Sequence, residues 1–108
     1  MKRSERALQI WQILISAAHN RQVLTYQIVG EITGMGAGTQ SQTLDMIMRY
    51  CKRNQLPPLT SLVVQKDSGK PGEGLTTVVD RDRDRERVFA VNWFGRRPVT
   101  VTDFEIKD

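Results

Sequence analysis

Residues 23–54 read VLTYQIVGEITGMGAGTQSQTLDMIMRYCKRN and predict two helices joined by a glycine-rich link. The hydroxyl of Thr25 can cap the first, short helix, whose N-terminal N–H groups lack partners within the helix. Gly34 can end that helix, because glycine readily adopts the left-handed backbone of a helix C-cap. The second helix should begin at Thr39 or Ser41. The first helix carries the apolar residues Ile28, Val29 and Ile32.

The second helix should run to about Asn54, and the pair Pro57-Pro58 would end it. Its apolar residues recur every three to four positions, which is typical of a helix with one buried face. The expected inward residues are Leu44, Ile47, Met48 and Cys51, and the mostly outward ones are Gln40, Gln42, Asp45, Arg49, Lys52 and Arg53.

A further helix is predicted upstream, from Ser4 as its N-cap to about Asn20. His19 lies near its end and should be a capping or exposed residue. The short run Gln22–Leu24 predicts a strand before the next helix. The apolar stripe of the upstream helix comprises Leu8, Ile10, Trp11, Ile13, Leu14, Ala17 and Ala18.

Downstream, two β-branched runs and an alternating tail predict strands at Leu62–Val64, Val88–Phe94 and Pro98–Phe104. The alternating charges of Asp80–Arg87 indicate a solvated segment without a site, for which a helical start near Thr76 or Thr77 is one option. Three helices, a strand and a Gly/Pro-rich turn are the order of a winged helix-turn-helix. We therefore expect a single α+β domain over residues 1–108, with three N-terminal helices followed by a small antiparallel sheet.

The composition limits the classes of protein to which the chain can belong. With 108 residues, of which 39% are hydrophobic, the chain has room for one small core. The single cysteine and single histidine exclude an internal disulfide and a structural zinc site, so we expect no cofactor. No apolar run reaches the roughly 20 residues of a membrane span, and the N-terminus lacks the pattern of a secretory signal. A cytoplasmic protein without a membrane partner is the expectation.

The charge suggests a polyanionic partner. The formal net charge is +4 and the isoelectric point is about 9.6. Residues 1–66 contain eight Lys and Arg against three Asp and Glu, whereas the rest contains eight against nine. The basic excess therefore lies in the N-terminal two-thirds, as expected for a nucleic-acid-binding face, although small soluble proteins often carry such a charge without that role.

Four short motifs give the chain a family resemblance. They are Ile10–Leu14, Val23–Tyr26, Ile32–Gly34, and Leu62–Val64 followed by Ser68-Gly69. Through these motifs, the chain from Ile10 to about Gly72 resembles the C-terminal DNA-binding domain of the O6-alkylguanine alkyltransferases and of their non-catalytic relatives, the alkyltransferase-like proteins. The resemblance implies a winged-helix fold that binds duplex DNA.

The chain departs from that family at its functional motifs. The active-site Pro-Cys-His-Arg, or Pro-Trp-His-Arg in many non-catalytic relatives, falls near Pro58–Ser61, where there is no thiol and no histidine. The family's arginine finger falls at about Gln42, whose amide supplies no cation, and the glycine after its Thr-Tyr pair is Gln27. Cys51 should be a buried structural residue, because a thiolate is disfavoured late in a helix. We therefore expect a protein that is not an enzyme.

The expected DNA contacts each have a plainer interpretation. Tyr26 could hold a phosphate at the helix-turn-helix or pack half-buried. The amides and hydroxyl of residues 40–42 could meet base edges or form an ordinary polar first turn. The basic side chains late in the helix could complement the helix dipole. Gly69–Gly72 could be a wing tip or a turn. The candidate DNA-binding residues are Thr25, Tyr26, Gln40, Ser41, Gln42, Arg49, Lys52, Arg53 and Lys70.

A second functional hypothesis uses another surface. A small protein-interaction module could keep the same scaffold and dock a protein partner through the predicted Val88–Phe94 strand, Trp93 and the C-terminal edge. A continuous basic face over the third helix would favour DNA. Scattered charge with Trp93 and Phe94 exposed would favour a protein partner.

Overall fold

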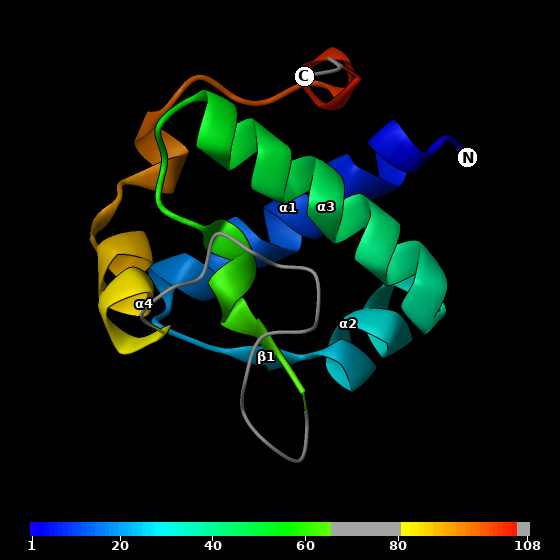
Figure 1. The fold of residues 1–108 in the computed structure, drawn as a ribbon, viewed down its shortest axis with the longest axis horizontal. Coiled ribbons are helices and arrows are strands. Elements are labelled where there is room, and N and C mark those ends of the chain that lie inside the picture. The colour runs from blue at the N-terminus through cyan, green and yellow to red at the C-terminus, as the bar shows by residue number, and fades with distance from the viewer. Residues whose placement is uncertain (66–80, 106–108) are drawn as a thin grey trace.

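The computed structural model describes residues 1–65 and 81–105 and is mostly helical, with one small sheet (Figure 1). The three helices predicted in the N-terminal half are present, and a fourth follows in the C-terminal half. The elements are α1 (Arg3–His19), β1 (Leu24–Thr25), α2 (Tyr26–Thr33), α3 (Ala37–Arg53), β2 (Val63–Val64) and α4 (Arg81–Ala90), with 3₁₀ turns η1 (Leu59–Leu62), η2 (Trp93–Gly95) and η3 (Val101–Phe104).

The core forms where α3 crosses α1 (Figure 1). The inward residues predicted for α3 are buried, and so are Ile10 and Leu14 of α1. An aromatic cluster extends this core toward the C-terminus. The Trp11 ring centroid lies 5.2 Å from that of Tyr50, 5.6 Å from Trp93 and 5.9 Å from Phe104. These rings join α1 and α3 to the 3₁₀ turns that follow α4.

The predicted ends of α2 are confirmed. The Thr25 Oγ1 accepts a hydrogen bond from the backbone N–H of Ile28 at 3.1 Å. Gly34 ends the helix with φ 75°, and its N–H donates to the carbonyl of Gly30 at 2.7 Å. Thr25 is therefore occupied within the fold as a helix cap.

Gly34→Ala should lower the free energy of unfolding by about 1–2 kcal/mol, because a Cβ strains the left-handed backbone. At both Gly34 and Gly38, a Cβ would have no atom of a more distant described residue within 4 Å, so the two substitutions do not differ in steric contacts. Gly38→Ala, inside α3, should instead raise the free energy of unfolding by up to about 1 kcal/mol. Urea denaturation measures both, and a Gly34→Ala variant at least as stable as the wild type would contradict the prediction.

The sheet differs from the prediction. β1 and β2 are parallel, with Leu24 opposite Val63 and Thr25 opposite Val64. The antiparallel prediction is therefore wrong for the strands that the structure describes. The physical reason is the connection: α2 and α3 lie between the two strands and form a crossover, whereas neighbouring antiparallel strands can be joined by a tight turn. The predicted wing at Gly69–Gly72 lies outside the described residues.

The predicted strand at Val88–Phe94 is also wrong. Val88 belongs to α4, where it is buried one helical turn after buried Asp84. The chain then turns through η2, and the indole Nε1 of Trp93 donates to the carbonyl of Val88 at 2.8 Å. That bond folds Trp93 back onto the end of α4 instead of extending the chain. Asp84 also corrects the expectation that residues 80–87 are simply solvated, since it is 6% exposed.

The predictions for the C-terminal tail and for the N-cap of α1 are wrong. The tail is not an edge strand: the Asp103 carboxylate accepts from the backbone N–H of Thr100 at 2.7 Å and stabilises η3. Ser4 is not the N-cap of α1, because the helix begins at Arg3 and Ser4 donates its hydroxyl to the Glu105 carboxylate at 3.2 Å. That contact ties the beginning of the described chain to its end. None of the described helices is long and apolar enough to cross a membrane.

Candidate nucleic-acid interface

Gln40 links α3 to the start of α2. Its side chain is 3% exposed, and its Nε2 donates to the carbonyls of Tyr26 at 3.1 Å and Met35 at 3.3 Å. The amide therefore satisfies two backbone acceptors that would otherwise lack this donor. The hypothesis that Gln40 meets base edges is wrong for this arrangement, and its role is to fix α2 against α3.

Tyr26 is the first residue of α2 and is half-buried against the core. Packing against the core therefore covers part of the surface of Tyr26. The start of α2 thus carries two residues of the candidate site, Thr25 and Tyr26, both partly occupied by the fold.

The exposed face of α3 carries the other candidate residues of that helix. Ser41 and Gln42 are exposed in its N-terminal part. Arg49 lies farther along, exposed, with its Nε 2.9 Å from the Asp45 carboxylate. Lys52 is exposed in the last turn, where its charge suits the negative end of the helix dipole. The structure therefore brings polar and then basic side chains together along one helix.

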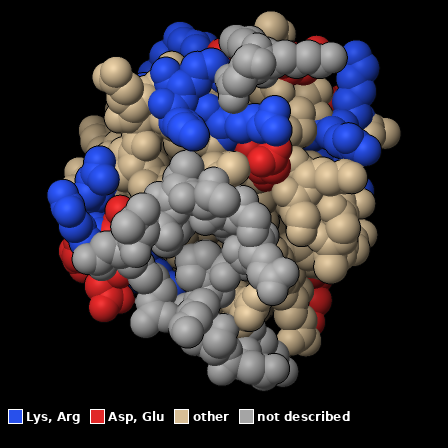
Figure 2. Space-filling view, in the orientation of Figure 1, with Lys and Arg blue, Asp and Glu red and all other residues tan. Residues whose placement is uncertain are grey.

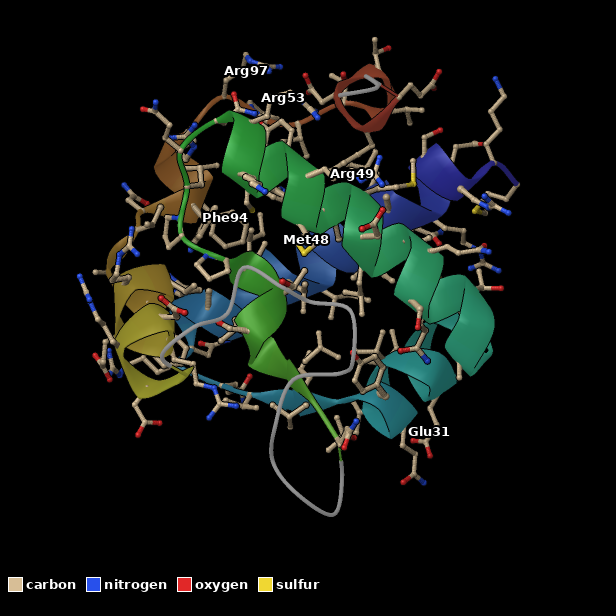
Figure 3. All side chains as sticks on the ribbon, in the orientation of Figure 1. Glu31, Met48, Arg49, Arg53, Phe94 and Arg97 are labelled. Atoms are coloured by element: carbon tan, nitrogen blue, oxygen red, sulfur yellow. The ribbon has the colours of Figure 1, made fainter. Side chains whose placement is uncertain are left out.

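Further arginines gather near the C-terminal end of α3, and two of them, Arg96 and Arg97, lie outside the predicted site. Arg97 approaches Asp103 at 3.2 Å, and Arg53 donates to the carbonyl of Asp103 at 2.8 Å. Arg96 is exposed and close enough to Cys51 to act on it electrostatically. Lys and Arg side chains gather over this end of α3 in Figure 2, and Figure 3 places Arg53 and Arg97 beside each other there.

Asp103 organises this basic group. Partial burial acts to raise the pKa of Asp103, but hydrogen bonds from Thr100 and Arg97 outweigh it and hold the pKa below its usual value. The carboxylate therefore stays ionised at neutral pH and holds both η3 and Arg97 in place.

The thiol of Cys51 and the hydroxyls of Thr60 and Ser61 are all buried. Desolvation raises the pKa of Cys51 to about 11, against smaller lowering effects of a hydrogen bond to the backbone of Leu59 and the charge of Arg96. The thiol is thus protonated at neutral pH. Cys51 is 2% exposed, which confirms the prediction of a buried cysteine. Thr60 and Ser61 are fully buried in η1, and neither hydroxyl has a hydrogen-bond partner among residues 1–65 and 81–105. Among the described residues, no cluster of His, Cys, Asp and Glu could hold a metal ion.

The surface through which a protein partner was expected to dock is only partly exposed. Trp93 is 5% exposed and belongs to the core. Phe94 is 59% exposed, and its ring stands edge-on to exposed His19 with centroids 6.0 Å apart.

Lys70 lies outside the described residues, so the described part of the candidate DNA-binding surface consists of the face of α3 and the start of α2.

Compared with protein-family models, curated proteins and solved structures, the chain has no match in any of the three.

Proposed function

We propose that this protein is a non-catalytic DNA-binding module that contacts duplex DNA through the exposed face of α3. The observation that most supports this is the order of side chains on that face. Ser41 and Gln42 are exposed in the N-terminal part of the helix, and Arg49 and Lys52 are exposed toward its C-terminus. Uncharged donors and acceptors suit base edges, whereas the cations suit phosphates.

The length of α3 agrees with this division of roles. Gln42 and Lys52 are ten residues apart, which corresponds to roughly 15 Å along a helix axis. The major groove of B-DNA is about 12 Å wide. One helix lying in the groove can therefore place Gln42 against bases while Lys52 reaches the phosphates at the groove's edge.

The winged helix-turn-helix is the architecture that we propose for this binding. In it, α2 and α3 are the helix pair, and Lys70, which lies outside the described residues, is assigned to the wing. The hydrogen bonds from Gln40 support the proposal, because a reading helix must hold one orientation relative to the helix that precedes it.

The non-catalytic part of the proposal has its own support. The positions that correspond to the alkyltransferase active site hold buried hydroxyls, and the Cys51 thiol has a pKa of about 11. A thiol acts as a nucleophile in its ionised form, which is scarce at neutral pH for such a group.

The double variant Ser41→Ala/Gln42→Ala should bind DNA more weakly and less selectively while it folds normally. Both side chains are exposed, so the free energy of unfolding should change by less than about 0.5 kcal/mol. Removing one bidentate hydrogen-bonded pair with a base should cost about 1–3 kcal/mol of discrimination. Fluorescence anisotropy measures binding to a duplex selected from a random-sequence pool and to a scrambled duplex.

Gln12→Ala/Ser16→Ala is the matched control, because it removes an exposed amide and an exposed hydroxyl from α1. It should bind the selected duplex as the wild type does. Equal affinity and selectivity of the α3 variant and this control would refute the proposed role of α3.

A further inference from the structure

A groove of about 170 Å³ lies between α1 and the chain around η2. Its walls include three core residues, one further aromatic residue and two cations. Small-molecule sites usually enclose about 300–1,000 Å³, so this groove suits one side chain better than a cofactor. The core residues are Trp11, Ile15 and Trp93, the aromatic residue is Phe94, and the cations are Arg96 and Arg97.

Phe94 is held out from the protein by a fixed turn. The side chain of Asn92 accepts a hydrogen bond from the N–H of Gly95 at 3.1 Å and caps η2. A Cβ at Gly95 would stand 2.4 Å from an atom of Asn92, so this turn is built closely around glycine. The backbone that carries the exposed ring is therefore fixed, which lowers the entropic cost of binding a partner against it.

The charge beside the groove is positive. Arg96 forms no ion pair with any residue that the structure describes. Arg97 is oriented by Asp103 at 3.2 Å, yet its side chain remains 66% exposed. An occupant of the groove therefore meets two accessible guanidinium groups next to an apolar surface, and carboxylates complement such groups well.

We infer that this groove docks an acidic segment of a partner protein through one large apolar side chain. The apolar side chain fills the groove against Phe94, and neighbouring carboxylates pair with Arg96 and Arg97. A DNA backbone offers phosphates to the arginines but has no apolar group to fill the groove, so the observations favour a peptide. The groove lies beyond the C-terminal end of α3, away from Ser41 and Gln42, and this docking does not depend on DNA binding.

The test begins with a random peptide library displayed on phage and selected on the full chain. Selected peptides should share one large apolar residue flanked by Asp or Glu. The best peptide is then synthesised together with a version in which Asn and Gln replace its acids. Titration should change the tryptophan fluorescence of the protein, because both tryptophans of the chain line this groove. The uncharged version should bind about tenfold more weakly or worse.

Matched variants locate the binding site. Phe94→Ala is compared with Ile32→Ala, since both side chains are 59% exposed and only Phe94 lies at the groove. Arg96→Gln is compared with Arg21→Gln, which removes the same charge from the loop after α1. Phe94→Ala and Arg96→Gln should each weaken the selected peptide about tenfold or more, and the two controls should leave its affinity unchanged.

Three results would overturn the inference. One is a selection that enriches no acidic peptide with an apolar anchor. Another is loss of binding in Ile32→Ala alone, which would place the docking surface on α2. The last is an Arg96→Gln variant that binds the peptide normally but duplex DNA more weakly, which would assign Arg96 to phosphate. Normal peptide docking with no DNA binding would refute only the proposed function.

Discussion

Trp11→Ala should lower the free energy of unfolding by about 3–5 kcal/mol, which is a large share of the stability of a small domain. Trp11 is 4% exposed, and its ring contacts Tyr50, Trp93 and Phe104. Removing the indole leaves a cavity at the point where α1, α3 and two 3₁₀ turns meet. The edge-on geometry with Tyr50 and Trp93 adds a stabilising contribution beyond buried area, and the alanine variant lacks it.

Phe94→Ala is the control for this prediction. Phe94 is aromatic too but 59% exposed, so its removal should change the free energy of unfolding by less than about 0.5 kcal/mol. Urea denaturation followed by far-ultraviolet circular dichroism gives both values. A decrease in Trp11→Ala of less than about 1 kcal/mol would mean that the aromatic cluster does not stabilise the native fold as the structure indicates.

The helices of the N-terminal half could be predicted because local signals and tertiary packing agree there. In α3 the apolar period of three to four matches the face that packs on α1. Around α2, the side-chain cap of Thr25 and the left-handed backbone of Gly34 fix both ends through local interactions alone. Such signals need no knowledge of distant residues.

The C-terminal half could not be predicted in the same way. Its β-branched and aromatic run from Val88 favours a strand by composition, but the buried positions Asp84 and Val88 are one helical turn apart. The bond from Trp93 to the Val88 carbonyl, together with packing on Trp11, decides the outcome. Tertiary contacts override local preference here. The parallel sheet likewise depends on a crossover that no short window of sequence reveals.

Only part of the candidate site could be predicted from the sequence. The spacing of α3 does contain a signal that Gln40 points inward, because it precedes Leu44 by four positions and so continues the stripe of Leu44, Ile47 and Cys51. Arg96 and Arg97 carry no such signal. They lie more than forty residues after α3 and join its basic end only through the fold.

Salt should weaken DNA binding strongly if the proposed function is correct. The residues that we propose contact phosphates are Tyr26, Arg49, Lys52, Arg53 and Lys70, of which Lys70 lies outside the described residues. About three to four such contacts, each with a slope near −0.9, predict a roughly 40- to 150-fold loss of affinity between ~50 and ~200 mM salt. Fluorescence anisotropy with one labelled duplex at several salt concentrations measures the slope.

Arg49→Gln/Lys52→Gln makes the salt prediction specific to α3, because it removes two phosphate-binding cations from exposed positions. Removing each cation lowers the slope by about 0.9, so the affinity of the variant should fall only roughly 3- to 12-fold over the same range. Arg21→Gln, which removes a charge paired with Glu86 on α4, should keep the wild-type slope. A wild-type affinity that stays flat with salt would contradict electrostatic binding altogether. Equal slopes in all three proteins would place the phosphate contacts away from α3.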